Sequence, residues 1–361
     1  MDRRRYGYPR RRNRPRQREW LLLLPLALVI GFVILASRLT EDSSGQLIGS
    51  SACPGSEGCA PAVYASVECT SGGACAPSPN DSTFVSDAAP PPITAQSAVI
   101  IEEPCGALLY GDSVRQRSAP ASLTKIATAL VAAERADLSE IVDVQVDGAE
   151  LALTTDSTVM GLEPGQQLSL RDLLYGLLLS SGNDAAIAIA EHVGFTTTAF
   201  VDLMNDKVEQ LELSDTHFTN PHGLDELGQY TSAFDIAMLG RELIRQPELA
   251  AIVRTTTYQP AWDGPLLWNG NRLVYSYPDS LGVKIGYTDG AQQTIVAAAE
   301  REGRRLIVSA LGSSSIYEDA VTLFEWAFAS SESVCRESGV SALGGQPMEL
   351  NEVRPDLGPY P

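Results

Sequence analysis

The sequence predicts an α/β protein of the α+β type, in which helices cover an antiparallel sheet. Strand-like segments occur near residues 98–110 and again after residue 281, while Ala- and Leu-rich segments with helical periodicity fill much of the chain between them. Strands and helices do not alternate, as they would in a parallel βαβ sheet. The sheet is therefore expected to form from segments that lie far apart in the sequence.

The strand segments support an N-terminal hairpin and a later group of strands. The apolar runs Ala98–Ile101 and Ala107–Tyr110 are separated by Glu102–Gly106, which is a typical hairpin pattern. Strand patterns return late in the chain, at Leu281–Tyr287, Thr294–Ala299 and Leu306–Leu311.

The helical segments show the apolar periodicity of helices that cover a core. They are Ser122–Ala136, Leu168–Leu179, Asp184–Val193, Thr197–Leu211, Ser232–Ile244 and Glu318–Phe328. All but the last lie between the early and the late strands, so the sheet is expected to enclose a helical region of the chain.

Composition divides the chain into five parts. Residues 97–331 hold the predicted strands and helices and are expected to form the folded domain. Residues 38–96 are polar, contain Cys and Pro, and end in Ala-Ala-Pro-Pro-Pro, which is typical of a flexible linker. Residues 332–361 are expected to be a disordered tail. Residues 1–19 and 20–37 are a basic tail and an apolar segment.

The net charge of −19 conceals a strongly basic start. Residues 1–19 carry nine arginines against Asp2 and Glu19, so the rest of the chain is more acidic than the total suggests. An acidic body argues against nucleic acid as a main partner. The simplest interpretation of this acidity is a solubilising surface.

The segment Trp20–Ser37 has eighteen residues without a charge. As a helix it would be about 27 Å long, just enough to cross a hydrocarbon core. The arginines before it predict a cytoplasmic N-terminus, and Trp20 suits the membrane interface. A cleaved signal peptide is the alternative, but its apolar core would be shorter, and Ile34–Ala36 fits its cleavage site poorly. We expect a single-pass anchor in the cell membrane, with the folded domain outside the cytoplasm.

Cysteine usage agrees with an oxidising compartment. Cys53 and Cys59 have the same spacing as Cys69 and Cys75, and each pair ends in Cys-Ala-Pro. Two local disulfides are the simplest interpretation. A four-thiolate metal site is the alternative, but the spacing exceeds the usual two to four residues and no histidine lies nearby.

The remaining cysteines, Cys105 and Cys335, lie towards opposite ends of the folded domain. They could pair across it, although the sequence does not fix the connectivity. No other group of residues has metal-ligand spacing, so neither a metal nor a cofactor is predicted.

Lysine is scarce in this chain. Of 26 basic residues only Lys125, Lys207 and Lys284 are lysines. A buried lysine can lose its proton, whereas arginine in practice cannot. We therefore expect a titratable amine to be needed at Lys125 and Lys284, and Lys207 to lie on a helix surface.

Ser122 and Lys125 stand three residues apart at the start of a predicted helix, so they share one face. A serine hydroxyl becomes an effective nucleophile when an adjacent base takes its proton. A buried lysine near a second cation, such as Lys284, has a lowered pKa and can be that base. An N-cap serine beside a solvated lysine would show the same spacing.

Two further elements favour the catalytic interpretation. Ser181–Asn183 lies between two predicted helices, where an ordinary turn could use the same residue types. In a catalytic site Ser181 would pass a proton and Asn183 would hold a substrate carbonyl. Lys284–Gly286 lies in a predicted strand, where Gly286 would allow a substrate backbone to approach. The three elements occur in the order known from β-lactamases and penicillin-binding proteins.

With its neighbouring segments, the chain resembles the serine D-alanyl-D-alanine carboxypeptidases, the low-molecular-mass penicillin-binding proteins. The resemblance covers about residues 92–330. It is carried by Pro120–Thr128, Met160–Gly165, Asp172–Leu177, Ser181–Ala186, Thr216–Leu224 and Gly282–Thr288. It implies a β-lactamase/transpeptidase-like antiparallel sheet flanked by helices, with a helical subdomain. It also implies peptidoglycan stem peptides ending in D-Ala-D-Ala as substrate and β-lactams as covalent inhibitors.

The resemblance implies a role for each residue of the first two motifs. Ser122 would be acylated with release of the terminal D-Ala, and Lys125 would be its base. Ser181 would relay a proton to the leaving amine, and Asn183 would orient the substrate carbonyl. Water would then hydrolyse the acyl-enzyme.

The resemblance also assigns the third motif to substrate binding. Lys284 would act electrostatically on Ser181 and on the substrate carboxylate, next to the strand position of Gly286. The backbone N–H groups of Ser122 and Tyr287 would form the oxyanion hole, where loss of one donor costs about 100- to 1,000-fold in rate.

Two carboxylate anchors of the family are missing from their usual places. The family usually has Thr or Ser in the middle of its third motif, and this chain has Ile285. Many members have an arginine before the final helix, where this chain has Ser315–Glu318. A DD-endopeptidase or a catalytically weakened peptidoglycan-binding homologue is therefore the alternative to a carboxypeptidase. A β-lactamase is less favoured, because Gly182 stands where it usually has Asp and no glutamate is identifiable as its deacylation base.

His217 and His222 are two of only three histidines in the chain. They delimit the segment His-Phe-Thr-Asn-Pro-His, which we expect to be a structural turn. A catalytic role is not needed, since Lys125 already supplies the base.

Overall fold

The computed structural model describes residues 67–69, 75–77, 83–84, 89–262, 264–330, 333 and 335. The basic tail 1–19 and the apolar segment 20–37 lie outside the described residues. Within the described part of the chain, no helix is long and apolar enough to cross a membrane.

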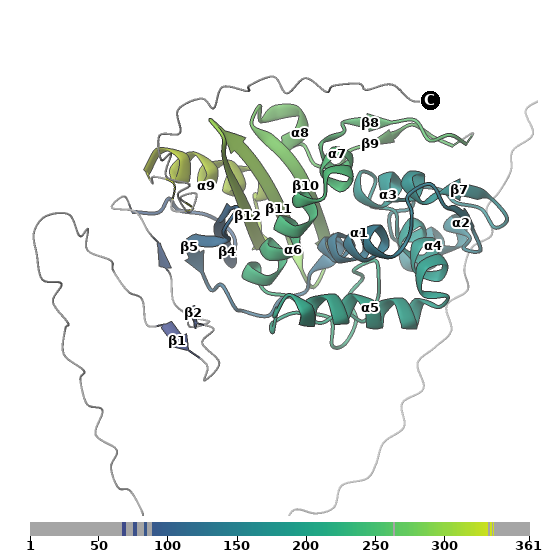
Figure 1. The fold of residues 1–361 in the computed structure, drawn as a ribbon, viewed down its shortest axis with the longest axis horizontal. Helices are drawn as coiled ribbons and strands as arrows, with labels where there is room; N and C mark the ends of the chain where they lie inside the picture. Colours follow the sequence, from purple (N-terminus) through teal and green to yellow (C-terminus); the bar gives the residue numbers. More distant parts are fainter. Residues whose placement is uncertain are drawn as a thin grey trace, which may run out of the picture. The chain divides into compact units, whose positions relative to one another are not determined.

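A six-stranded antiparallel sheet lies at the centre of the described fold (Figure 1). In spatial order its strands are β10 (Ser280–Thr288), β11 (Gln292–Arg301), β12 (Arg304–Ser313), β4 (Ser97–Glu103), β5 (Ala107–Asp112) and β3 (Thr83–Phe84). The hairpin β4–β5 therefore pairs with β12, the last strand of the described residues, from Leu311 opposite Ser97 to Arg305 opposite Glu103. The predicted hairpin, and the assembly of the sheet from distant segments, are confirmed.

Both faces of the sheet are buried, which explains the nearly continuous apolar runs of its strands. In β4, Ala98 and Ile100 belong to one apolar core, while Val99 and Ile101 belong to the other. The first core lies between the sheet and α9 (Ile316–Ser330). The second and larger core lies between the opposite face and the remaining large helices.

Most of the other helices pack on that second face and beside it (Figure 1). They are α1 (Thr124–Arg135), which follows a 3₁₀ turn over Ala121–Leu123, then α2 (Gly148–Thr155), α3 (Leu170–Leu178), α4 (Asn183–Gly194), α5 (Thr197–Gln210), α6 (Ala233–Arg245) and α7 (Pro247–Arg254). The short helix α8 (Leu273–Ser276) instead contributes Leu273 to the first core, on the side of α9. Helix α6 contacts the sheet directly, whereas α3, α4 and α5 pack around α1 as a helical subdomain.

Local sequence explains where several helices begin. Ser169, Thr196 and Ser232 precede α3, α5 and α6, and the side-chain oxygen of each accepts a hydrogen bond from a backbone N–H in the first turn. All six predicted helices are confirmed, with ends within two residues of those predicted. The short helices α2, α7 and α8 were not predicted.

Three small two-stranded sheets complete the described secondary structure. They pair β1 (Val67–Cys69) with β2 (Cys75–Pro77), β6 (Ile141–Asp143) with β7 (Gln167–Ser169), and β8 (Thr257–Tyr258) with β9 (Leu267–Trp268). The backbone register places Cys69 directly opposite Cys75, in line with the predicted local pairing. Cys53 and Cys59 lie outside the described residues.

Folded contacts extend beyond both ends of the predicted domain 97–331. Strand β3 lies within the predicted linker and pairs with β5, and the Thr94 hydroxyl donates a hydrogen bond to Asp319. A disulfide joins Cys105 to Cys335, which confirms the pairing that the sequence left possible. Residues 336–361 of the predicted tail lie outside the described residues.

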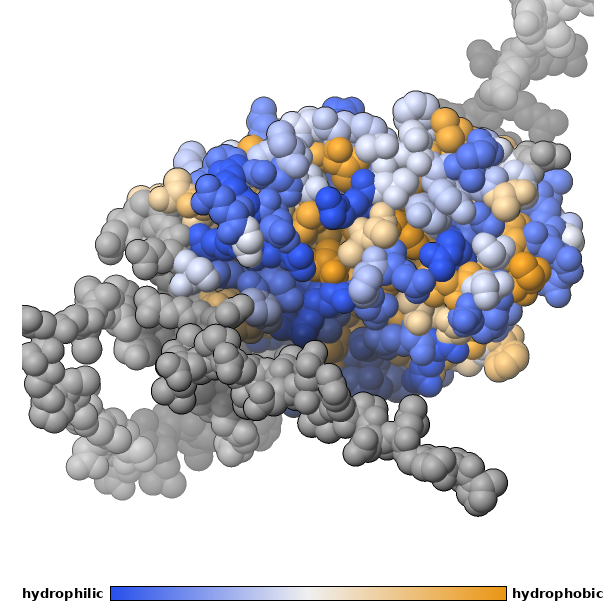
Figure 2. Space-filling view, turned by 45° about the horizontal axis from the view of Figure 1, so that its top comes forward, coloured by the Kyte–Doolittle hydropathy of each residue, from blue (hydrophilic) through white to orange (hydrophobic). Residues whose placement is uncertain are grey.

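Hydrophilic residues predominate on the face shown in Figure 2, and apolar residues are exposed there in small groups. The large apolar side chains that are exposed among the described residues are Ile141, Leu153, Phe195, Leu227, Leu266, Trp268, Tyr275 and Tyr287. Scattered apolar exposure is normal for a folded domain. Three of these residues line cavities: Tyr287 lines one, and Leu266 and Trp268 line another.

Candidate active site

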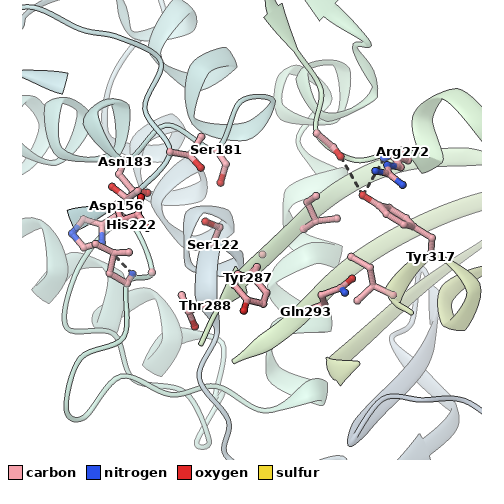
Figure 3. Close-up of a pocket in the computed structure, with 18 of the residues that line it drawn as sticks. Ser122, Asp156, Ser181, Asn183, His222, Arg272, Tyr287, Thr288, Gln293 and Tyr317 are labelled. Carbon is pink, nitrogen blue, oxygen red and sulfur yellow. Dashed lines mark hydrogen bonds between the residues drawn. The ribbon is translucent and has the colours of Figure 1, made fainter. Parts of the chain in front are cut away.

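A cleft of about 940 Å³ opens between β10 and the helical subdomain. Figure 3 shows Ser122 in the middle of this cleft, with Ser181, Asn183 and His222 on one side and Arg272 and Tyr317 on the other. Five predicted site residues line it: Ser122, Ser181, Asn183, Gly286 and Tyr287. The other two, Lys125 and Lys284, are buried, with 0% and 2% of their surface exposed.

Ser122 lies in the 3₁₀ turn that leads into α1, and Lys125 lies in the first turn of that helix. Their side chains meet, with Lys125 Nζ 3.0 Å from Ser122 Oγ. The turn is supported by Gly223, whose φ is +97°. A Cβ there would lie 1.9 Å from the carbonyl oxygen of Ala121, so only glycine allows this loop to pack behind the serine.

The Lys125 amine has three partners. Besides Ser122 Oγ, its Nζ is 2.6 Å from Asn183 Oδ1 and 2.6 Å from the carbonyl oxygen of His222. Both of these oxygens only accept hydrogen bonds. In a neutral amine they take the two N–H groups, which leaves the lone pair directed at the serine hydroxyl.

The electrostatic surroundings favour that neutral amine. Burial lowers the pKa of Lys125 well below its ordinary value, the Lys284 ammonium lowers it further, and the Asp184 carboxylate raises it. Lys284 therefore acts on Lys125 as expected. The pKa of Lys284 itself is lowered to about 7 by burial alone.

Asn183 is the first residue of α4 and is buried beside the cleft. Since its Oδ1 accepts from Lys125, its Nδ2 group is left to donate to a substrate. Ser181 lies in the preceding turn with φ at +62°. Within the described residues its hydroxyl forms no hydrogen bond, so it can donate or accept in the cleft.

Asp184 follows Asn183 and fixes the loop at Met160–Leu162, which lies beside the cleft. Its buried carboxylate accepts hydrogen bonds from the backbone N–H groups of Met160, Gly161, Leu162 and Ala185. These bonds replace the water that a buried carboxylate loses. One side chain thereby fixes the loop before α3 and places a negative charge close enough to influence Lys125.

Lys284 lies in β10 and donates a hydrogen bond from Nζ to the carbonyl oxygen of Ile285 at 2.9 Å. It also lines a second, smaller cavity together with Ser181. No direct hydrogen bond joins Lys284 to Ser181 among the described residues, so an effect of the lysine on the serine would act through space.

Gly286 brings β10 against the serine turn. A Cβ at this position would lie 2.8 Å from the backbone nitrogen of Ser122 and 2.8 Å from Thr294 Oγ1. The glycine is thus required by the protein's own packing. Tyr287 follows it with a side chain that is 61% exposed and donates to Asp289 Oδ1 at 3.1 Å, which raises the pKa of the Tyr287 phenol.

The two histidines of the predicted turn differ in position. His217 pairs through its backbone with Tyr230, and its ring bonds to the Gly228 carbonyl, so its structural role is confirmed. His222 lines the cleft and gives its carbonyl to Lys125. Its ring accepts a hydrogen bond from the Leu224 N–H, and burial followed by Lys125 lowers its pKa to about 4. The ring is therefore neutral at pH 7.

Arg272 is a site residue that the sequence analysis missed. It precedes α8, lines the cleft, and its guanidinium lies 5.7 Å from the ring of Tyr317. No carboxylate of the described residues forms an ion pair with it. The family's arginine usually precedes the final helix, whereas in this chain an arginine reaches the cleft from the loop before α8. Asp156 and Glu318 are the acidic side chains in the same lining.

No group of three or more metal-ligating side chains occurs within the described residues.

The sheet, the helical subdomain and the Ser122–Lys125 pair place the chain in the fold class of DD-transpeptidases and penicillin-binding proteins. The Streptomyces K15 DD-transpeptidase superposes with a TM-score of 0.64 at 28% identity, over 67% of this chain and 100% of that one. The sequence profile of the D-alanyl-D-alanine carboxypeptidases matches residues 84–315. The chain belongs to this family.

Two curated relatives show the extent of the similarity. D-alanyl-D-alanine carboxypeptidase DacF of Bacillus subtilis is 37% identical over 229 residues, which is 61% of this chain and 58% of that protein. D-alanyl-D-alanine carboxypeptidase DacB2 of Mycobacterium tuberculosis is 34% identical over 245 residues, 65% of this chain and 82% of that protein. The match to DacF thus spans less than two thirds of that relative.

Replacing Gly286 by alanine should displace Ser122. The added Cβ would meet the Ser122 nitrogen at 2.8 Å, and a displacement of about 1 Å in an active site can cost about 100-fold in rate. We expect Gly286→Ala to slow acylation by a fluorescent penicillin at least about 100-fold. Gly270→Ala is the control for folding, since its Cβ would make only ordinary contacts at 3.6 and 3.8 Å and should preserve the unfolding free energy. A wild-type acylation rate in Gly286→Ala would contradict the packing argument.

Replacing Lys284 by methionine should stabilise the folded protein. With a folded pKa of about 7 against an ordinary value of 10.5, burial of the protonated lysine costs most below pH 7. That cost declines as the pH rises towards 10.5. We expect Lys284→Met to raise the unfolding free energy by about 1–4 kcal/mol at pH 6, with a smaller gain at pH 9.5.

Urea denaturation at both pH values measures the gain, and Lys207→Met is the matched control. Lys207 is paired with Glu134 at 2.6 Å, and its replacement should give no such pH-dependent gain. Equal stability of Lys284→Met and wild type at pH 6 would show that burial of Lys284 carries no cost.

Proposed function

We propose that this chain is a membrane-anchored serine D-Ala-D-Ala carboxypeptidase that trims peptidoglycan stem peptides through an acyl-enzyme on Ser122. The observation that carries the proposal is the Lys125 amine, 3.0 Å from Ser122 Oγ and bound on its other sides by two carbonyl oxygens. The membrane anchor rests on the uncharged segment Trp20–Ser37 and the arginines before it.

In the acylation step, Ser122 Oγ attacks the carbonyl carbon between the two D-alanines and Lys125 takes the hydroxyl proton. The C–N bond then breaks, and a proton passes through the Ser181 hydroxyl to the leaving amine. Asn183 Nδ2 holds a substrate carbonyl, since its Oδ1 is already bound to Lys125. The products are the acyl-enzyme and D-Ala.

The oxyanion of the tetrahedral intermediate is assigned to the backbone N–H groups of Ser122 and Tyr287. Support comes from the close approach of β10 to the serine turn at Gly286 and from the position of both residues in the cleft lining. Such donors act best where they are fixed before the reaction. Deacylation by water then returns Ser122 to its starting state.

The substrate's terminal carboxylate is assigned to Arg272. Ile285 has no hydroxyl to bind a carboxylate, but it lines the same cleft as the Arg272 guanidinium. Arg272 has no ion-pair partner within the described residues, and guanidinium binds carboxylate in a planar, two-pronged geometry. Lys284 adds a second positive charge when it is protonated. β-Lactams, which also carry a carboxylate, would acylate Ser122.

Release of D-Ala from a synthetic pentapeptide ending in D-Ala-D-Ala tests the proposal directly. Wild type should release D-Ala and be labelled covalently by a fluorescent penicillin. Ser122→Ala should lose both activities by at least about 1,000-fold, since it lacks the nucleophile. Ser139→Ala, an exposed serine outside the cleft, is the control. A folded wild type that neither releases D-Ala nor becomes labelled would refute the proposed chemistry.

Arg272→Leu should remove the preference for a free carboxylate. A hydrogen bond to a charged group contributes about 1.5–3 kcal/mol, so the ratio of kcat/KM for the free acid to that for the C-terminal amide should fall about 10- to 100-fold. Arg117→Leu is the matched control, because Arg117 also stacks on a tyrosine, at 4.5 Å from the Tyr230 ring, and does not line the cleft. An unchanged ratio in Arg272→Leu would exclude Arg272 as the anchor.

A further inference from the structure

A second cavity of about 440 Å³ adjoins the catalytic cleft. The two share four lining residues, which are Thr158, Ser181, Gly270 and Ile285. The walls that belong to the second cavity alone are mainly apolar: Val159, Met160, Leu179, Pro265, Leu266, Leu267 and Trp268, besides Ser180 and the buried Lys284. Its size and lining are those of a small-molecule site.

Ile285 forms an apolar wall where the two cavities meet. A Cβ placed on Gly270 would be in ordinary contact with Ile285 Cδ1, at 3.8 Å. The isoleucine therefore extends towards the loop that carries Arg272. Where the usual third motif has a hydroxyl, Ile285 thus places apolar surface at the entrance to the second cavity.

The second cavity lies on the leaving-group side of the scissile bond, given the proposed function on which this inference rests. Ser181, which protonates the leaving nitrogen, lines both cavities. Arg272, which holds the carboxylate next to that nitrogen, follows the shared residue Gly270 by two positions. The side chain of the leaving residue therefore starts near the shared boundary.

We propose that the second cavity is a subsite for the side chain of the leaving D-residue and that it accepts an unbranched aliphatic chain as well as the methyl group of D-Ala. The substrate class is a D-Ala-D-X peptide with a free carboxylate, in which X carries an unbranched aliphatic side chain. Leu266 and Trp268 are 42% and 61% exposed, so a chain longer than the cavity continues into solvent between them.

The reaction with such a substrate forms and breaks the same bonds as the carboxypeptidase step. The Ser122 Oγ–C bond forms and the C–N bond to the D-residue breaks. The serine proton goes to Lys125, and the leaving nitrogen receives a proton through Ser181. Water then releases the shortened stem peptide, so the reaction requires no additional reactant.

The experiment compares two synthetic pentapeptides that end in D-Ala-D-Ala and D-Ala-D-norleucine, using the full chain. Each methylene placed in an apolar pocket is worth about 10-fold or more in kcat/KM. The wild type should release D-norleucine with a kcat/KM at least equal to that for D-Ala. Leu266→Asp, which places a charge in the second cavity only, should lower the norleucine-to-alanine ratio of kcat/KM at least about 10-fold.

Two further variants keep the test independent of folding defects. Trp268→Ala removes a second wall at a position exposed enough to tolerate the change and should lower the same ratio. Phe195→Asp is the matched control, because Phe195 is 90% exposed and lines neither cavity; it should leave the ratio unchanged.

The outcomes separate this inference from the proposed function. Release of D-Ala without D-norleucine, or a ratio that does not change in Leu266→Asp and Trp268→Ala, overturns the subsite and leaves the carboxypeptidase function standing. Release of neither amino acid, together with no penicillin labelling, overturns the proposed function and the subsite with it. Cleavage of both peptides with the predicted fall in ratio supports the subsite.

Discussion

The site depends on one buried amine. Lys125 is fully enclosed, and the loops around it contribute the Asn183 amide oxygen and the His222 carbonyl. These two acceptors fix the direction of the lone pair, which points to Ser122. Burial lowers the pKa of the same amine. Without these two acceptors, a lysine at the same helix position would keep the Ser-x-x-Lys spacing, but its amine would not be held in a fixed orientation. The loop at His222 and the turn before α4 therefore matter as much as the Ser-x-x-Lys spacing itself.

Much of the surrounding structure serves to keep those groups in place. Gly286 allows β10 to contact the serine turn, Gly223 allows the loop of His222 to pack behind it, and Asp184 gathers four backbone N–H groups around the turn of Asn183. At each of these three positions, protein groups in fixed positions take the place of water. The low-polarity environment that results is what lowers the pKa of both lysines. A less closely packed arrangement would leave Lys125 protonated and unable to accept the serine proton.

The sequence predicted the larger elements and the catalytic motifs because their signals are local. Periodicity identified the six longer helices and the strands of the main sheet except β3, and lysine scarcity pointed to Lys125 and Lys284. The shorter elements α2, α7, α8, β8 and β9 were missed. Helices α2 and α7 have eight residues each and α8, β8 and β9 have two to four, which is too little to show a clear periodicity. Arg272 was missed for a different reason. Its loop reaches the cleft only through the packing of β8, β9 and α8, and no spacing along the chain records that contact.

The difference between short catalytic motifs and a residue brought in by another loop is consistent with the proposed role of Arg272 in a chain that lacks the usual hydroxyl at Ile285. The catalytic groups must keep fixed distances to the scissile bond, so they lie in short motifs on rigid elements. A carboxylate needs a positive charge at the edge of the cleft, and a guanidinium can supply it from any loop that reaches there. If Arg272 has that role, as we propose, the position of Ile285 no longer has to be polar. Ile285 is then available to set the size and polarity of the leaving-group side. On this proposal, the residue that departs from the motif determines specificity and is not a defect in catalysis.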